Sequence, residues 1–337
     1  MRAILQTGYG SVDDLELGEV PRPEPAADEV LVRVRAASVH PDVWHVVAGR
    51  PAVLRLMGSG VRRPRERVPG TDVAGVVESV GSAVTRFRPG DEVFGETVRG
   101  VQWRNGGAFA EYATAPEDGV ALKPSDVSFE EAAAVPTAGL IALNNLPQRR
   151  VPSGSRVLVN GAGGGVGAFA VQLAKAYGAE VTGVDHARKL ALVRSLGADR
   201  VIDYTSEDFT RSGEQWDLVL DVPGNHPFRA VRRALDLRGS YVLIGHDAFG
   251  ATGHRWLGSI PRVLGLVARS AVTPQLRGGS FASPDKRLSM GTLAEMLERG
   301  QLRVVLDRTF PLSQTPQALR HLMSGQPVGR VVVRVDD

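Results

Sequence analysis

The residues with the clearest chemical signature lie at 156–167, where the sequence reads RVLVNGAGGGVG. A short β-branched run meets a cluster of glycines, interrupted only by Ala162 and Val166, and an apolar, helix-prone segment follows. Glycine lets the chain turn sharply, and the lack of side chains lets a pyrophosphate approach the free N–H groups of a helix N-terminus. The stretch therefore predicts a phosphate-binding turn between a buried strand and a helix.

These glycines fit the dinucleotide fingerprint G-x-G-x-x-G as Ala162-x-Gly164-x-x-Gly167, with alanine in the first slot. The pattern alone is weak, because a purely structural tight turn also explains it. Here a strand precedes it and alternating helices and strands follow, which favours cofactor binding. The residues predicted to hold the pyrophosphate are Gly161, Ala162, Gly163, Gly164, Gly165, Val166 and Gly167.

The sequence carries opposing signals about which nicotinamide dinucleotide is bound. Asp185 ends the next predicted strand, at roughly the 20-residue spacing expected of an acid that accepts hydrogen bonds from the adenosine ribose. Such a carboxylate favours NAD(H) and repels a 2′-phosphate. Arg188 and Lys189 follow within one turn, and arginine suits a phosphate. A solvated helix start explains these two residues equally well, so NAD(H) and NADP(H) both remain open.

The elements that must position this loop occupy the middle of the chain, where strands alternate with helical segments. FAVQLAKAYG, ARKLALVRSLG and FRAVRRALDLRG each have apolar residues at helical spacing and end in glycine. This alternation predicts a parallel sheet covered by helices on both faces. The predicted strands are Arg156–Asn160, Glu180–Asp185, Arg200–Asp203, Asp217–Asp221 and Ser240–Gly245.

The flanking regions differ in texture from the middle. Residues 1–123 carry short β-type runs such as EVLVRVRAASV and VAGVVESVG between glycines and prolines, which predict a barrel or sandwich. Residues 302–337 return to β-type runs, VVLDRTF and GRVVVRV, around one short helical stretch.

Composition excludes several classes of protein. A formal net charge of +3 demands neither nucleic acid nor membrane as a partner, and the basic run at 61–67 reads as a solvated loop. The absence of cysteine removes disulfides, thiolate nucleophiles and zinc sites that need sulfur. No signal peptide or membrane span is visible, so we expect a cytoplasmic protein. An apolar and basic segment at 255–272 predicts an amphipathic helix at a substrate mouth or dimer contact rather than on a membrane.

Taken together and in order, these motifs resemble the medium-chain dehydrogenase/reductase superfamily. GTDVAGVVESVG, GGAFAEYA, AAAVPTAGLIAL, the fingerprint, LGADRVIDY and GRVVVRV are most similar to the zinc-independent, quinone oxidoreductase-like branch. The resemblance implies an α/β protein with a GroES-like β-barrel catalytic domain at 1–123 and 302–337. It also implies a Rossmann domain, a doubly wound parallel sheet, at 124–301, and a homodimer.

The resemblance also bears on metals. Zinc-bearing relatives hold their catalytic metal with Cys, His and Cys, and this chain has Ser38 and Thr71 at two matching positions. The loop of structural cysteines is shortened to TVRGVQWRNGG. We therefore expect no zinc. His40, Asp42 and His45 could imitate a metal cluster, but their spacing does not obviously converge, so no metal ligand is predicted.

Further cofactor contacts follow from the resemblance, position by position. Arg188, Lys189 and Tyr204 match residues around the 2′-phosphate in NADPH-using members, where the position of Asp185 is usually small and uncharged. The remaining matches lie beside the nicotinamide and its phosphates or near the cleft: Pro136, Thr137, Gly245 and Arg330.

Without a metal, hydride transfer to a simple carbonyl loses its main charge stabiliser. A quinone or an enone spreads the developing charge by conjugation, and a hydrogen-bond donor can stabilise the resulting oxygen. The predicted catalytic residues are His40, His45 and Thr71, with Ser38 as a further donor. His40 replaces an asparagine common among relatives, which leaves the substrate open.

Three alternatives remain beside an NAD(P)H-dependent reductase of small-molecule quinones or enones. The first is an alcohol dehydrogenase or carbonyl reductase. The second is a pathway-specific tailoring reductase with one dedicated substrate. The third is a non-catalytic nucleotide-binding homologue whose altered cleft has lost activity.

Overall fold

The computed structural model describes residues 1–100, 104–147, 151–245, 256–276 and 285–335. The chain divides into two compact units. Unit 1 comprises Met1–Leu140, Pro284–Gly300 and Val304–Asp337, and unit 2 comprises Ile141–Ser283 and Gln301–Arg303.

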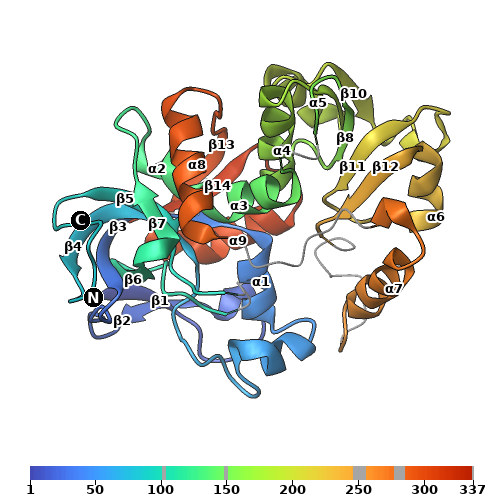
Figure 1. The fold of residues 1–337 in the computed structure, drawn as a ribbon. Coiled ribbons are helices and arrows are strands. Elements are labelled where there is room, and N and C mark those ends of the chain that lie inside the picture. The colour runs from blue at the N-terminus through green and yellow to red at the C-terminus, as the bar shows by residue number, and fades with distance from the viewer. Residues whose placement is uncertain (101–103, 148–150, 246–255, 277–284, 336–337) are drawn as a thin grey trace. The chain divides into compact units, whose positions relative to one another are not determined.

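Unit 1 is built on a seven-stranded, mostly antiparallel sheet in the order β13-β14-β3-β4-β5-β7, with β6 paired to β3 (Figure 1). Its strands are β3 (Glu29–Val39), β4 (Asp72–Val80), β5 (Glu92–Glu96), β6 (Tyr112–Pro116), β7 (Val120–Leu122), β13 (Leu306–Pro311) and β14 (Arg330–Arg334). A separate ladder joins β1 (Arg2–Leu5) to β2 (Glu16–Glu19). Its helices are α1 (Pro41–Ala48), α2 (Phe129–Ala133), α8 (Lys286–Glu298), α9 (Thr315–Met323) and the start of α3 (Pro136–Asn145).

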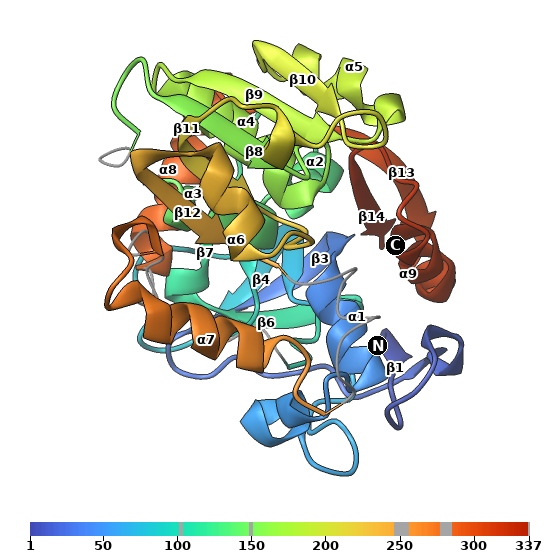
Figure 2. The ribbon, with the colours of Figure 1, turned by 90° about the vertical axis from the view of Figure 1, so that its right-hand side faces the viewer.

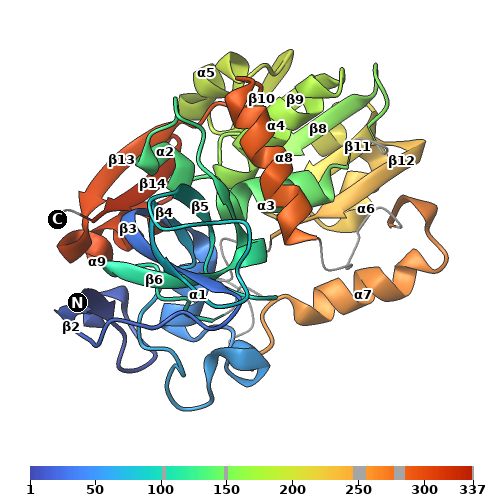
Figure 3. The ribbon, with the colours of Figure 1, turned by 60° about the vertical axis from the view of Figure 1, so that its left-hand side comes forward.

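The long strand β3 organises unit 1 because apolar residues from both its halves are buried. Val30 and Val32 pack in a cluster with Val93 of β5. Val39 packs in a second cluster with Leu319 of α9, the helix that lies against β13 and β14 (Figure 3). The predicted β-type runs EVLVRVRAASV, VAGVVESVG, VVLDRTF and GRVVVRV thus lie in strands of one sheet.

Unit 2 contains a five-stranded parallel sheet in the order β10-β9-β8-β11-β12 (Figure 2). The strands are β8 (Arg156–Asn160), β9 (Glu180–Asp185), β10 (Arg200–Asp203), β11 (Trp216–Asp221) and β12 (Leu235–Leu243). The helices are α4 (Gly165–Ala176), α5 (Ala187–Ser195), α6 (Phe228–Val231), α7 (Ile260–Ser270) and the end of α3. The predicted bounds of β8, β9 and β10 are confirmed, as is the α/β class with a parallel sheet.

The helix predicted from FRAVRRALDLRG was wrong in its second half. Helix α6 continues only as a short 3-10 turn over Arg232–Ala234, and strand β12 begins at Leu235. Leu235 is buried and pairs with Trp216 of β11, which is also buried. Burial of these side chains in the core of unit 2 outweighs the helical spacing of the segment, since tertiary packing overrides local preference.

The compact units differ from the predicted domains in three segments, of which the shortest, residues 302–303, falls within the predicted GroES-like domain and belongs to unit 2. Residues 124–140 and 284–300 fall within the predicted dinucleotide-binding domain, and both belong to unit 1 in the structure. Helix α8 packs on β7, and Lys286 at its first position pairs with Glu96 of β5. The boundaries at 123/124 and 301/302 stay predictions about domains.

The predicted amphipathic segment at 255–272 contains helix α7. Leu264 and Val267 are exposed, whereas Leu266 packs on the core of unit 2. Across the ranges that the structure describes, no helix is long and apolar enough to cross a membrane.

A pair of glycine substitutions tests how tightly α4 is fixed against its loop. A Cβ on Gly167 would lie 2.0 Å from the carbonyl oxygen of Gly161, whereas a Cβ on Gly291 inside α8 would meet nothing within 4 Å. We expect Gly167→Ala to destabilise the protein by about 1–3 kcal/mol through overpacking. Gly291→Ala should stabilise it by about 0.5–1 kcal/mol through helix propensity. Urea denaturation measures both, and equal midpoints would contradict this packing.

Candidate functional site

The predicted phosphate-binding turn of unit 2 leaves β8 and enters α4. Gly161 has a φ of +81°, a backbone conformation that favours glycine. The N–H groups of Gly161 and Ala162 donate to the carbonyl oxygen of Val184 at 2.9 and 3.0 Å, which ties the turn to β9. Gly164 is the N-cap of α4, so the first N–H groups of that helix face the turn without helical partners.

The turn is close-packed on one side and open on another. A Cβ on Gly163 would meet Cβ of Lys189 at 2.8 Å and Oδ2 of Asp185 at 3.2 Å. A Cβ on Gly164 would have only the carbonyl oxygen of Gly161, at 3.2 Å, within 4 Å. The turn is therefore packed against Asp185 and Lys189 at Gly163, whereas Gly164 and Gly165 are partly exposed.

Asp185 belongs to the turn as well as to the end of β9. The side chain is buried, with 7% of its surface exposed. Its Oδ2 accepts from the N–H of Gly163 and its Oδ1 from the N–H of His186, both at 2.8 Å. Each oxygen keeps a second lone pair for a further donor such as a ribose hydroxyl.

The remaining predicted contacts in unit 2 gather at the carboxyl ends of parallel strands, where α/β proteins bind nucleotides. Arg188 is exposed in the first turn of α5. Tyr204 follows β10, is 54% exposed, and its ring lies edge-on to that of His186. Gly245 follows β12, where a Cβ would lie 2.3 Å from the carbonyl oxygen of Val222. The structure thus brings these residues to one edge of the sheet.

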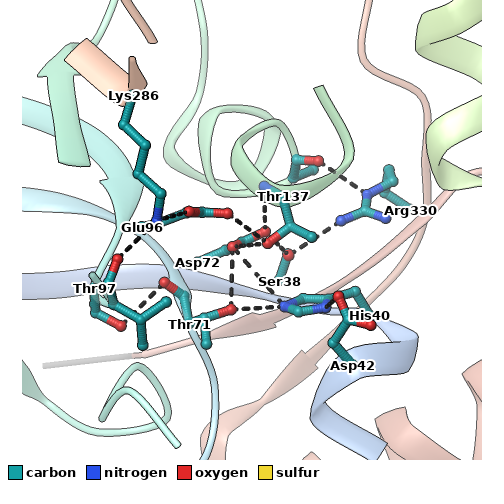
Figure 4. Close-up of polar contacts among 12 residues, drawn as sticks. Ser38, His40, Asp42, Thr71, Asp72, Glu96, Thr97, Thr137, Lys286 and Arg330 are labelled. Carbon is teal, nitrogen blue, oxygen red and sulfur yellow. Dashed lines mark hydrogen bonds and ion pairs between the residues drawn. The ribbon is translucent and has the colours of Figure 1, made fainter. Parts of the chain in front are cut away.

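Unit 1 contains a buried polar cluster centred on the carboxylate of Asp72 at the start of β4 (Figure 4). Asp72 is 0% exposed. Its Oδ2 accepts from Ser38 Oγ at 2.9 Å and from the N–H of Thr137 at 3.1 Å. Its Oδ1 accepts from Thr137 Oγ1 at 2.5 Å and from Thr71 Oγ1 at 3.3 Å. Strands β3 and β4 and helix α3 therefore meet at this one side chain.

A second carboxyl group lies beside the first. Glu96 is the last residue of β5, is 0% exposed, and has its Oε1 3.1 Å from Thr137 Oγ1. Lys286 of α8 approaches Glu96 Oε2 at 2.5 Å and donates to the carbonyl oxygen of Val98 at 2.8 Å. Thr137, which follows Pro136 at the start of α3, contacts both carboxyl groups.

Two predicted catalytic residues adjoin this cluster. His40 Nε2 lies 2.8 Å from Thr71 Oγ1, and the imidazole is 1% exposed. His40 Nδ1 is buried without a hydrogen-bond partner in the described part of the chain, 3.8 Å from an oxygen of Asp42. The structure therefore joins His40 to Asp72 through the hydroxyl of Thr71.

Arg330 closes the cluster from β14. The side chain is 7% exposed, and its Nε donates to the carbonyl oxygen of Ala134 at 2.9 Å. Its Nη2 donates to Ser38 Oγ at 3.2 Å, so Ser38 links the guanidinium to Asp72. The predicted residues Arg330 and Thr137 are thus committed to bonds within unit 1, and their roles toward a cofactor stay predictions.

Burial shifts the pKa values of three ionisable side chains in the cluster, His40, Asp72 and Glu96. It lowers the pKa of His40 to about 4, with Asp42 opposing and Arg330 adding to the effect, so the imidazole is neutral near pH 7. Burial also raises the pKa values of Asp72 and Glu96. Hydrogen bonds from Thr137 oppose the rise at Asp72, and the charge of Lys286 opposes it at Glu96.

His45 is separate from the cluster. It lies in the last turn of α1, its Nδ1 is 2.8 Å from the carbonyl oxygen of Arg50, and its ring meets that of Trp44 edge-on. This hydrogen bond secures the end of α1. Within the described ranges no group of three or more His, Asp or Glu side chains is arranged to hold a metal ion, and His40, Asp42 and His45 form none.

Sequence reasoning missed three residues of the cluster: Asp72, Glu96 and Lys286. A signal for two of them was present, because each acid interrupts an otherwise apolar run, in TDVAGVV and EVFGE. Charged residues are almost never fully buried unless they are paired. Lys286 carried no such signal, since it reaches β5 from a segment distant in the sequence.

The lowered pKa of His40 predicts a pH-dependent stability. An unfolded histidine gains its proton below about pH 6.5, whereas the folded one resists until about pH 4. Stability contributed by neutral His40 is therefore complete above pH 6.5 and is lost as the pH falls from 6.5 towards 4. At about 1.4 kcal/mol per pKa unit, the loss is about 3 kcal/mol.

Denaturant midpoints measured between pH 7 and 4 for the wild type and His40→Gln test this expectation. The variant should lose less stability than the wild type over that range. The difference between the two profiles removes the contributions to the pH dependence that come from other groups. These groups are Asp42, Asp72 and Arg330, which face the imidazole or its hydrogen-bond partner. Parallel profiles would show that His40 does not resist protonation.

Family models match both parts of the chain. Residues 26–125 match an alcohol dehydrogenase GroES-like domain, and residues 196–333 match a family described as zinc-binding dehydrogenase. The second description names a metal, but this chain has no cysteine.

Whole-chain similarity is stronger. The chain is 33% identical to a chloroplastic quinone-oxidoreductase homologue of Spinacia oleracea, over 99% of this chain and 98% of that one. It is also 33% identical to an NADPH-dependent alkenal/one oxidoreductase of Arabidopsis thaliana, over 99% and 79%. The quinone oxidoreductase of Coxiella burnetii superposes with a TM-score of 0.82 at 28% identity, covering 100% and 99%. The chain therefore belongs to the medium-chain dehydrogenase/reductase superfamily, in its quinone oxidoreductase-like branch.

Proposed function

We propose that this protein is an NAD(P)H-dependent, zinc-independent oxidoreductase that reduces quinones or activated double bonds. The observation that carries the proposal is the glycine turn between β8 and α4, which is partly exposed at Gly164, the N-cap of the helix. The alkenal/one oxidoreductase of Arabidopsis and the quinone-oxidoreductase homologue of spinach support the substrate class. We also propose that the protein is a homodimer and that it is cytoplasmic. A molecular mass of one chain, measured by light scattering, would contradict the dimer.

The residues of unit 2 fit a dinucleotide. A pyrophosphate at the N-terminus of α4 would meet free N–H groups, with no side chain from Gly164 in its way. Asp185 offers its remaining lone pairs to a ribose, with Tyr204 at the next strand end. When bound, the nicotinamide would supply the hydride.

The donor set at the positions of the zinc ligands argues for metal-free chemistry. Ser38 and Thr71 present neutral hydroxyls there, and both donate to Asp72. Zinc sites are built from thiolate, imidazole and carboxylate ligands rather than from such hydroxyls. A conjugated acceptor needs only a hydrogen-bond donor for its developing oxygen charge, and neutral His40 is of that type.

Turnover assays distinguish the proposal from its alternatives. Oxidation of NADPH and NADH is followed against 1,4-benzoquinone and simple enones, before and after exhaustive dialysis against a chelator. We expect reduction of at least one conjugated acceptor that the chelator leaves unchanged. Activity on simple alcohols or aldehydes that requires added zinc would instead indicate a metal-dependent alcohol dehydrogenase. Tight cofactor binding without oxidation on any acceptor would indicate a non-catalytic homologue.

Asp185 is expected to set the preference between the two cofactors. Its negative charge disfavours a 2′-phosphate, whereas Arg188 beside it favours one. We predict that Asp185→Asn raises kcat/KM for NADPH relative to NADH by about tenfold, the value of a 1.4 kcal/mol change. The amide oxygen can still accept from the N–H of Gly163, so the bond to the turn is kept, whereas the bond from the N–H of His186 is lost.

Asp185→Ser serves as the matched comparison, because it removes the charge and both carboxylate oxygens. A ratio unchanged in both variants would show that Asp185 does not contact the ribose. Loss of binding of both cofactors in the serine variant alone would show that the bond to the turn is the more important one.

A further inference from the structure

The hydroxyl of Thr137 contacts two carboxyl groups but carries one hydrogen. Its Oγ1 lies 2.5 Å from Asp72 Oδ1 and 3.1 Å from Glu96 Oε1. Two ionised carboxylates would both be acceptors, so the hydroxyl could satisfy only one of them. If the two carboxyl groups hold one proton between them, the hydroxyl donates to one and accepts from the other. Only then are both contacts hydrogen bonds.

The pairing of β4 with β5 gives a second, independent reason to place one proton on the two carboxyl groups. Asp72 of β4 and Glu96 of β5 are direct cross-strand partners, and both are 0% exposed. Like charges opposite each other in a ladder are destabilising, and burial removes the water that would screen them. One shared proton removes this repulsion without any change in the fold.

The two nearby cations offset the negative charge of Asp72 and Glu96 to different extents. Lys286 approaches Glu96 Oε2 at 2.5 Å, whereas Arg330 is linked to Asp72 through Ser38. Burial raises the pKa values of both acids in spite of these cations, which is the direction that proton retention requires.

A continuous series of polar contacts connects this pair to both ends of the cluster (Figure 4). At one end Lys286 has a side chain that is 18% exposed, which gives the pair contact with solvent. At the other end Thr71 Oγ1 lies 3.3 Å from Asp72 and 2.8 Å from His40 Nε2. His40 is the predicted donor to the substrate, so the series runs from solvent to that donor.

We propose that Asp72 and Glu96 share one proton through Thr137 and that this pair is the proton store of the reaction, emptied through Thr71 and His40. The proposal rests on the function proposed above. The proposal goes beyond that function by naming the source of the proton.

The proton balance of the reduction requires such a source. A bound nicotinamide would supply the hydride, which would form a C–H bond at the β-carbon of an enone and leave negative charge on the carbonyl oxygen. That oxygen takes the proton on His40 Nδ1, while Nε2 takes the hydroxyl proton of Thr71. Thr71 takes a proton from Asp72 in turn, as a carboxyl O–H bond of the pair breaks. The pair, left as two carboxylates, recovers its proton from solvent beside Lys286. Asp72 and Glu96 act through His40 and do not touch the substrate.

Glu96→Gln is the decisive variant. The amide N–H₂ of glutamine can donate to Thr137 Oγ1 as a protonated glutamic acid does, so the contacts of the fold are kept. It cannot release a proton. Glu92→Gln is the matched control, because Glu92 lies on the same strand and pairs with Lys123 at 3.0 Å, but is exposed and faces Val76 rather than an acid across the ladder.

Infrared spectroscopy of the cofactor-free protein at neutral pH provides the first measurement. We expect the carbonyl band of a protonated carboxylic acid, shifted in D₂O, in the wild type and in Glu92→Gln. The band should be absent from Glu96→Gln, where Asp72 is left ionised. A wild type without this band would overturn the proposal.

Turnover with a conjugated acceptor provides the second measurement. In the wild type kcat should fall at alkaline pH, because the pair loses its proton as the pH rises through its apparent pKa. In Glu96→Gln kcat should drop by about 10²-fold, the lower end of general acid effects, with the alkaline fall removed and KM nearly unchanged. If Glu96→Gln has the same kcat and the same pH profile as Glu92→Gln, the proposal is wrong. Because the infrared test needs no substrate, a band without any turnover would support the shared proton and overturn the function proposed above, together with the role of the pair in it.

Discussion

The buried carboxylate of Asp72 is the constraint around which unit 1 is assembled. A charge removed from water costs several kcal/mol unless donors surround it. Ser38 on β3, Thr71 before β4 and Thr137 on α3 supply those donors. Each of these side chains is short, so the strands and the helix must approach closely for the bonds to form. Satisfying one carboxylate therefore fixes three segments relative to one another.

The same constraint explains why the end of the chain returns to unit 1. The acids at Asp72 and Glu96 face each other across the ladder, and the cations nearest to them come from α8 and β14. A unit made only of the first 140 residues would bury two acids without Lys286 and Arg330. The C-terminal segments thus complete the charge balance of the cluster as well as the sheet.

In unit 2 one carboxylate, that of Asp185, holds the glycine turn and is also expected to contact the cofactor. Asp185 accepts from the backbone of the turn at Gly163, and the same carboxylate is the expected partner of the ribose. In the proposed function, a change at this residue would alter both the charge facing the adenosine and the geometry of the turn expected to bind the pyrophosphate. Asp185 thus has a structural role in the turn beside Arg188, although the two side chains favour different cofactors.

Local patterns were enough to predict much of the molecule from its residues. The glycine turn, the strands at 156–160, 180–185 and 200–203 and the β character of both ends follow from hydrophobic periodicity and backbone freedom, which act over short stretches of chain. The end of the helix after Phe228 could not be predicted, because Leu235 is drawn into a strand by Trp216 of a neighbouring one. The polar cluster was equally hidden, since Asp72, Glu96 and Lys286 come from three distant parts of the sequence. Their proximity depends on strand register and on helix packing, and these exist only once long-range burial has folded the chain.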